Sequence, residues 1–226
     1  MTGPGFTYCL QKLGSAKVRG CAGSLHRTHR DLRPNAQIWS SVEKTKTVDR
    51  FYDNGVRGTR MLDTAAPSGS SGSESYMSKE RKCVLDCQLG GTGGTPSVPA
   101  RFSVQLEHVV SEDDVQRFLG YLRVKQRTSF LYKGEFRYDL TQVQQGGSVV
   151  EALKAPPSFE IELEWCGQSA FAAAAGASAA APGELQAAVA SRFLLKVKDL
   201  VAMHHRGQEK HMQAQADKAV ASAGGS

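Results

Sequence analysis

The sequence predicts a mainly β protein, an antiparallel sheet closed into a barrel with flanking helices. Three observations predict this class. Apolar and charged residues alternate in segments such as 101–110 and 121–132, which is the pattern of strands with one polar face. Turns and loops rich in Gly, Pro, Ser or Asn separate these segments. Near the C-terminus, apolar residues recur instead at helical spacing. Many short strands joined by turns are typical of a barrel with packed helices.

The first half of the chain contains four expected strands. Residues 1–40 have mixed composition and little periodicity, so we treat them as a separate, undetermined segment. Asn54-Gly55 marks a tight turn between two strands within 47–61. Further along, strands are expected at 79–89 and 101–110, and Gly-, Ser- and Pro-rich loops at 63–75 and 90–99.

The second half adds three strands and two helices to this prediction. Ser111 and Asp114 resemble a capping pair, which predicts a short helix ending at Gly120. Lys133-Gly134 marks a turn between two alternating strands. The remaining elements are strands at 121–132, 135–143 and 158–166, a loop at 144–157, an Ala/Gly-rich linker at 169–183 and a helix at 184–203 with apolar residues four apart.

Length and composition set broad limits on this fold. The chain has 226 residues and a net charge of +6, which suits one domain with tails and a basic surface that favours polyanions. We divide it into an undetermined segment (1–40), a barrel domain with its C-terminal helix (41–203) and a polar, frayed tail (204–226). We expect no membrane helix and no secretory signal, and the five scattered cysteines indicate reduced thiols inside a cell. The tail histidines indicate a solvated helix end rather than metal ligands.

The last strand places three carboxylates on one face. Glu160, Glu162 and Glu164 alternate with apolar residues, so they lie about 6.6–7 Å apart along the strand. Their negative charges repel one another unless nearby cations compensate them. Lys125 and Arg127, which share one face of another strand, are candidates for such cations. Hard oxygen ligands favour Mg²⁺ or Mn²⁺. Carboxylates on one wall and bases on another suit a metal-bound polyphosphate. An exposed polar face balanced by neighbouring bases is the alternative.

Seven segments, in order, resemble the metal-dependent RNA 5′-triphosphatase of fungal and protist mRNA capping, a member of the triphosphate tunnel metalloenzyme superfamily. They are TVDRFY, GVRGTR, MSKERKCVL, RFSVQLE, RVKQRTSFLY, FRYDLTQV and FEIELEW, within residues 47–166. DLTQV and the glutamate strand are the most specific. The resemblance implies a tunnel barrel of about eight strands. It also implies hydrolysis of the γ-phosphate of nascent mRNA, with Mg²⁺ or Mn²⁺ as cofactor. The resemblance further implies a nuclear location, the capping guanylyltransferase as a partner, and a homodimer. It implies no association with a membrane.

The resemblance also assigns site residues. It implies metal binding by Glu160, Glu162 and Glu164. It implies a catalytic tunnel whose acidic members are Glu107 and Asp139, and Asp139 either holds Arg137 or a lysine in place or orients a metal-bound water. The basic tunnel positions that match are Arg57, Lys79, Arg81, Arg101, Lys125 and Arg127, of which all but Arg81 are also assigned to substrate phosphate.

One departure from the family leaves three functions open. The family's first strand carries a pair of glutamates, whereas Tyr8 and Leu10 stand at the equivalent places in YCLQKLG, and the first acidic residue is Asp31. We therefore expect the first strand to be missing or degraded, which weakens metal binding and leaves an open sheet edge. The alternatives to an RNA triphosphatase are a module that binds triphosphate ends or a capping partner without turnover, and a tunnel enzyme for small polyphosphates.

Overall fold

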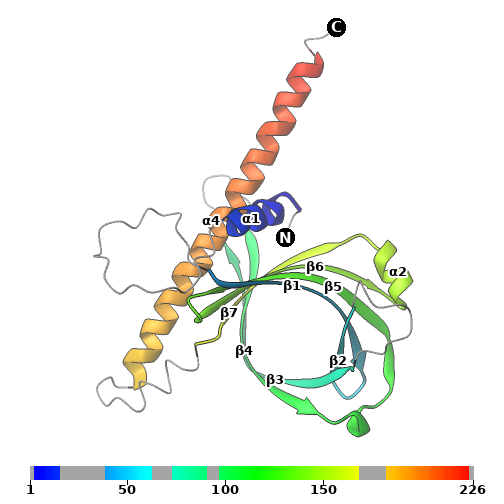
Figure 1. Cartoon of the computed structure of the whole chain (residues 1–226). Coiled ribbons are helices and arrows are strands. Elements are labelled where there is room, and N and C mark those ends of the chain that lie inside the picture. The colour runs from blue at the N-terminus through cyan, green and yellow to red at the C-terminus, as the bar shows by residue number, and fades with distance from the viewer. Residues whose placement is uncertain (1–2, 16–38, 63–72, 91–96, 168–181, 224–226) are drawn as a thin grey trace. The chain divides into compact units, whose positions relative to one another are not determined.

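A computed structural model describes residues 3–15, 39–62, 73–90, 97–167 and 182–223. It contains one seven-stranded sheet in the order β4-β3-β2-β1-β5-β6-β7, together with helices (Figure 1). The strands are β1 (Trp39–Tyr52), β2 (Val56–Met61), β3 (Ser75–Leu89), β4 (Val98–Val110), β5 (Phe118–Tyr132), β6 (Phe136–Gly146) and β7 (Ser158–Trp165). The helices are α1 (Gly3–Ser15), α2 (Val149–Lys154) and α4 (Pro182–Ala223), with a 3₁₀ turn η1 at Glu112–Asp114. The mainly antiparallel β class with flanking helices is confirmed.

Both predicted tight turns are present. Gly55 has a φ of +77° and its N–H donates to the carbonyl of Tyr52 at 3.0 Å, which closes the β1–β2 hairpin. Lys133 and Gly134 have φ values of +52° and +70°, between β5 and β6. Turns that need positive φ select Gly and Asn, which is why these two could be found from the sequence.

Two predictions around the middle of the chain are wrong. The helix expected from Ser111 to Gly120 stops after η1, because Val115 already has extended backbone (φ −77°, ψ 128°) and β5 begins at Phe118. The loop expected at 144–157 contains the end of β6 and helix α2. Ser148 caps this helix by accepting a hydrogen bond from the Glu151 N–H. Six helical residues are too few to show a periodic pattern.

The helical ends of the chain also differ from the prediction. Helix α4 continues to Ala223 through the tail that we expected to be frayed, and His204 is buried rather than solvated. The segment YCLQKLG lies within helix α1, so it is not a strand. Gly5 makes the contact between these helices possible, since a Cβ there would lie 2.2 Å from Nδ1 of His204. The linker predicted at 169–183 lies largely outside the described residues.

The chain divides into two compact units, which we describe separately. The first comprises Lys44–Thr128 and Thr141–Glu160, and the second comprises Thr2–Glu43, Ser129–Leu140 and Ile161–Ser226. In the second unit, the fully buried Trp39 packs its ring 5.2 Å from Phe130 and 5.4 Å from Tyr138. Its indole N–H donates to the carbonyl of Leu13 at 2.9 Å, which ties α1 to this core.

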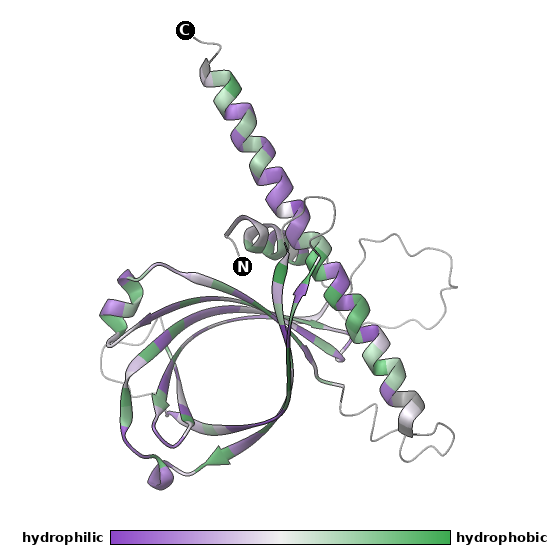
Figure 2. Cartoon of the chain, turned by 180° about the vertical axis from the view of Figure 1, so that it is seen from behind, coloured by the Kyte–Doolittle hydropathy of each residue, from purple (hydrophilic) through white to green (hydrophobic). Residues whose placement is uncertain are grey.

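The first unit has one apolar and one charged sheet face. Val48, Leu122, Val124 and Ala152 form a buried cluster, so α2 covers the apolar face of β1 and β5. The residues between them along each strand are polar or charged, and Figure 2 shows this alternation along the strands. In the helices that the structure describes, no segment is long and apolar enough to span a membrane.

Candidate active site

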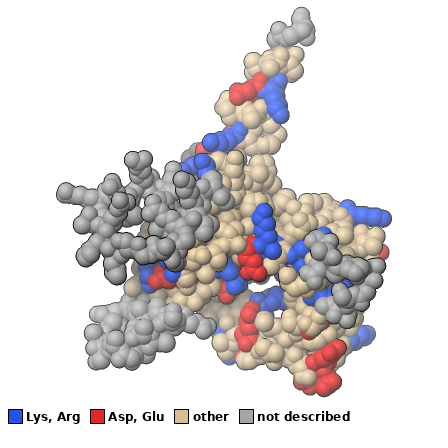
Figure 3. All heavy atoms as spheres, viewed as in Figure 1, with Lys and Arg blue, Asp and Glu red and all other residues tan. Residues whose placement is uncertain are grey.

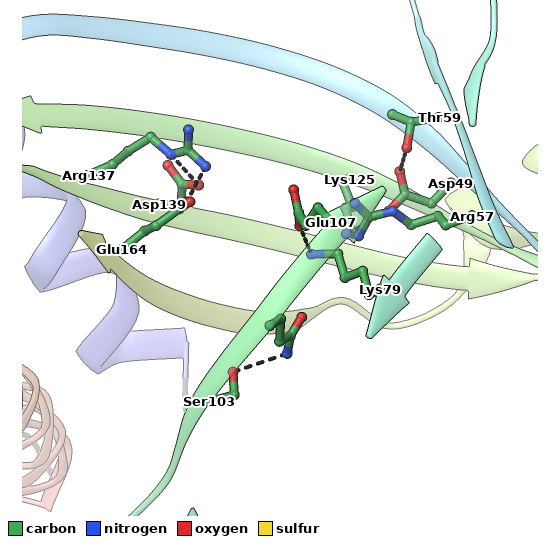
Figure 4. A network of polar contacts seen from close by, with 11 residues as sticks. Asp49, Arg57, Thr59, Lys79, Ser103, Glu107, Lys125, Arg137, Asp139 and Glu164 are labelled. Atoms are coloured by element: carbon green, nitrogen blue, oxygen red, sulfur yellow. Dashed lines mark hydrogen bonds and ion pairs between the residues drawn. The ribbon is translucent and has the colours of Figure 1, made fainter. Parts of the chain in front are cut away.

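A buried carboxylate organises the charged face of the first unit. Asp49 in β1 is 2% exposed and accepts a hydrogen bond from the Thr59 hydroxyl at 3.0 Å. Lys125 Nζ lies 2.7 Å from Asp49 Oδ2. Arg57 Nε lies 4.0 Å from the same oxygen, which is a charge–charge contact rather than a hydrogen bond (Figure 4). One carboxylate therefore holds two of the predicted phosphate-binding cations.

The sheet register explains why these side chains meet. Asp49 is opposite Thr59, and Phe51 is opposite Arg57, in the β1–β2 pair. Residues directly opposite in an antiparallel pair point to the same face. Lys125 is only 9% exposed, and burying a charge is costly unless an opposite charge is close to it. The Asp49 carboxylate supplies that opposite charge at this face.

Strands β3 and β4 carry four more predicted residues on this face: Lys79, Arg81, Arg101 and Glu107. Arg57 is opposite Met77 in the β2–β3 pair, so Lys79, two residues further along, shares its face. Lys79 is in turn opposite Glu107, and their side chains form an ion pair of 2.5 Å. Arg81 is opposite Gln105, two residues from Glu107. The register thus carries the charged face across β1, β2, β3 and β4.

Arg101 is one of the exposed assigned cations. It binds Asp86 through two hydrogen bonds, from Nε at 2.7 Å and from Nη2 at 3.1 Å. These hydrogen bonds from Arg101 lower the pKa of the Asp86 carboxyl. Because the side chains of this pair are 57% and 61% exposed, a phosphate oxygen can replace Asp86 at little energetic cost.

Arg127 is fixed by the DLTQV segment. Its Nε donates to the hydroxyl of Thr141 in β6 at 3.2 Å, and Thr141 is completely buried. Arg127 also lies two residues after Lys125 along β5, so both point to the charged face. All five predicted phosphate-binding residues are therefore in the first unit. Figure 3 shows basic and acidic side chains intermingled rather than in separate patches.

The second unit holds a separate charged cluster. Arg137 Nε donates to Asp139 Oδ2 at 3.2 Å, and Arg137 Nη2 contacts Glu164 (Figure 4). Burial of the guanidinium opposes its charge, but the two carboxylates outweigh this effect and the pKa of Arg137 is raised. Of the roles left open for Asp139, holding Arg137 is the one that this geometry displays.

The glutamate strand has the predicted alternation. In β7, Glu162 and Glu164 are exposed, whereas Ile161, Leu163 and Trp165 are partly buried. Within the described residues, no three acidic, His or Cys side chains gather closely enough to hold a metal ion. Glu164 instead contacts Arg137. The metal ligands therefore stay a prediction.

Asp49 is the site residue that the sequence did not single out. It lies within TVDRFY, one of the segments that carry the resemblance, but both faces of that strand carry charge. Arg50, its neighbour on the other face, pairs with Glu74 at 3.0 Å. A carboxylate next to an arginine on a strand is most simply explained as a surface ion pair, so alternation alone does not mark Asp49 as buried.

This fold is found among solved RNA triphosphatases. The structure of the Pct1 RNA triphosphatase of S. pombe matches 91% of this chain and 69% of its own, with a TM-score of 0.57 and 19% identity. A second structure, Pct1 in complex with the Spt5 CTD, matches 91% of this chain and 68% of its own, with a TM-score of 0.54 and 20% identity. The resemblance read from the sequence is thereby confirmed as a shared fold. No family model and no curated protein matches the sequence.

Proposed function

We propose that the chain is a metal-dependent polynucleotide 5′-phosphatase that removes the γ-phosphate from 5′-triphosphorylated RNA, the first step of mRNA capping. The observation that supports this most is the Asp49–Lys125–Arg57 cluster. A buried carboxylate holds two cations on the face that also carries Lys79 and Arg127. Fixed cations that gather on one sheet face are what transfer of a highly charged phosphoryl group requires.

The residues of the charged face divide into two roles. Lys125 and Arg57, held by Asp49, bind non-bridging phosphate oxygens and stabilise the charge that shifts to the leaving group. Arg127, Lys79 and Arg101 bind the remaining phosphate oxygens, and Lys79 and Arg101 leave Glu107 and Asp86 to do so. Thr141 holds Arg127 through its Nε, so that the guanidinium is fixed where it binds phosphate.

The chemistry of the β7 side chains suits a hard divalent cation, because Glu160, Glu162 and Glu164 supply carboxylate oxygens on alternate residues and two of these side chains are exposed. We assign Mg²⁺ or Mn²⁺ to these three residues, whose side chains would have to move together to hold the ion. When bound, such an ion neutralises phosphate charge and supplies an activated water. Glu164 leaves Arg137 to take part, and Asp139 then retains that guanidinium.

Binding without turnover is the second candidate. It is favoured by helix α1, because Tyr8 and Leu10 lie on a helix where the family has a strand with two glutamates. Within the described residues, α1 therefore supplies no carboxylates to partner those of β7. The same basic face would still bind a triphosphate end.

The cellular setting follows from the same proposal. A capping phosphatase acts on nascent RNA, so we propose a nuclear location, the capping guanylyltransferase as a partner, and a homodimer. One of the similar solved structures shows Pct1 in complex with the Spt5 CTD.

Phosphate release from 5′-triphosphorylated RNA tests the proposal. We expect release that needs Mg²⁺ or Mn²⁺, is lost in Glu162→Ala and persists in Glu209→Ala, which removes an exposed glutamate from α4. Release that is equal with and without chelator contradicts the metal assignment. A folded chain that binds the RNA but releases no phosphate leaves the binding module as the function.

A further inference from the structure

An aromatic pair lies on the charged face of the first unit. The rings of Phe51 and Tyr121 are stacked, with centroids 4.8 Å apart and an interplanar angle of 9°. Phe51 is opposite Arg57 in the β1–β2 pair and two residues from Asp49, so it shares their face. Tyr121 lies four residues before Lys125 along β5, about 13 Å at the rise of a strand. The pair therefore lies on the face where we place the phosphates, a few residues along β5 from Lys125.

An arginine completes this cluster. The guanidinium carbon of Arg123 lies 5.3 Å from the centroid of the Phe51 ring, which is a cation–π contact. Arg123 Nε is buried and makes no hydrogen bond to the residues that the structure describes. Tyr121 is 39% exposed, so part of its ring remains open. Two flat rings, an arginine plane and an unused donor are the groups with which proteins hold an unpaired nucleobase.

A purely structural role explains less of this cluster. Cross-strand aromatic pairs do stabilise sheets, but such a pair needs neither an open ring next to the cations nor a buried donor left without an acceptor. By contrast, Phe118 is similarly exposed at 37% and makes an edge contact with Tyr52 at 6.1 Å. Among the described residues, Arg50 interacts with the hydroxyl of Tyr52 and no arginine lies over either ring, so this pair serves as a comparison.

We propose that Phe51, Tyr121 and Arg123 form a binding site for the first nucleobase of the RNA, which stacks on the open ring of Tyr121 while Lys125 and Arg57 hold its triphosphate. This site rests on the proposed function and specifies its substrate class: a nucleotide end rather than an inorganic polyphosphate. Because every base has a π face, the site accepts all four bases.

Two matched RNA ligands test the site. One is a short 5′-triphosphorylated RNA, and the other is the same RNA without a base on its first nucleotide. Loss of that base is expected to weaken binding to the unaltered chain roughly 5- to 150-fold, the range of base–aromatic stacking. Tyr121→Leu should weaken binding of the intact RNA by a similar factor and leave the abasic RNA unchanged. Tyr121→Phe and the comparison variant Phe118→Leu should bind both RNAs like the unaltered chain.

Three results would overturn the site: equal affinity of the unaltered chain for both RNAs, binding of neither RNA, or an equal loss for both RNAs in Tyr121→Leu. The last result would mean that Tyr121 only supports the sheet. Phosphate release is measured separately. A chain that binds the first base through Tyr121 and releases no phosphate refutes the hydrolase but retains this site. A chain that releases phosphate and binds both RNAs with equal affinity retains the hydrolase and refutes the site.

Discussion

Lys125 Nζ lies 2.7 Å from Asp49 Oδ2, and their side chains are only 11% and 3% exposed. Few ion pairs in the described parts of the chain are as buried as this one. A buried pair is strongly destabilised when one partner alone is removed, because the other charge is left without compensation. Asp49 and Lys125 are therefore coupled in stability as well as in the proposed chemistry.

The first prediction concerns this pair. Asp49→Asn keeps the shape of the side chain but leaves the Lys125 ammonium without a counter-charge, so we expect a loss of about 3–5 kcal/mol in the free energy of unfolding. The double variant Asp49→Asn/Lys125→Met should recover a large part of that loss, since it removes the stranded charge. Urea unfolding of the two single variants and the double variant measures the coupling. Additive losses would show that the two residues do not act as a pair.

The second prediction concerns Thr141. Thr141→Val has nearly the same shape but cannot accept the hydrogen bond from Arg127 Nε. We expect a loss of about 1–2 kcal/mol in stability, since a partly buried donor loses an acceptor. Phosphate release should fall several-fold, because the guanidinium is no longer fixed. Thr141→Ser, which retains the hydroxyl, is the control, and it should keep most of the activity. A Thr141→Val variant with unaltered turnover would mean that Arg127 needs no such support.

Most of the sheet could be predicted because its strands follow simple rules. Turns such as Asn54-Gly55 need residues that tolerate positive φ, and alternation between them shows which residues share a face. The cations Lys125 and Arg127 were found in this way. Their partner Asp49 was not, because alternation gives the face of a residue but not its depth. Whether a carboxylate is buried depends on which strands come together, and a single strand does not carry that information.

The helical parts show the opposite difficulty. Helix α1 buries Phe6, Cys9 and Leu13 at helical spacing, but this short pattern follows Pro4 and Gly5 and was not recognised in the sequence. Its place is fixed by contacts with distant residues, such as the hydrogen bond that the Leu13 carbonyl accepts from Trp39. Likewise, the expected helix after Ser111 gave way to β5, where Gly120 adopts a φ of +82°. In both cases tertiary contacts outweighed weak local preferences.

The third prediction tests how α1 is attached to the core of the second unit. Trp39→Ala removes a fully buried ring that contacts Phe130 and Tyr138 and that donates to Leu13. We expect a loss of about 3–5 kcal/mol in unfolding free energy. Trp39→Phe should cost less, since it keeps most of the packing but leaves the Leu13 carbonyl without its donor. Protection of α1 amides from hydrogen exchange should fall in both variants, and unchanged protection would show that Trp39 does not hold the helix.

The fourth prediction is a dependence of stability on pH that arises from His204. Burial, with a smaller contribution from His205, lowers the pKa of the His204 imidazole below its ordinary value. The unfolded chain therefore takes up a proton at a higher pH than the folded chain does. Stability is fully present above the ordinary histidine pKa of about 6.5 and is lost as the pH falls through the lowered value.

His204→Gln should flatten this part of the profile, because glutamine keeps a polar side chain beside Gln208 but does not titrate. We expect the unfolding free energy of the unaltered chain to fall more steeply than that of the variant between pH 7 and pH 5. Urea unfolding across this range measures the difference. His211→Gln, on the exposed part of α4, is the matched control and should keep the slope of the unaltered chain. If His204→Gln retained that slope as well, the acid sensitivity would have to come from other groups. The contact of His204 with Gly5 would then contribute to stability through packing only.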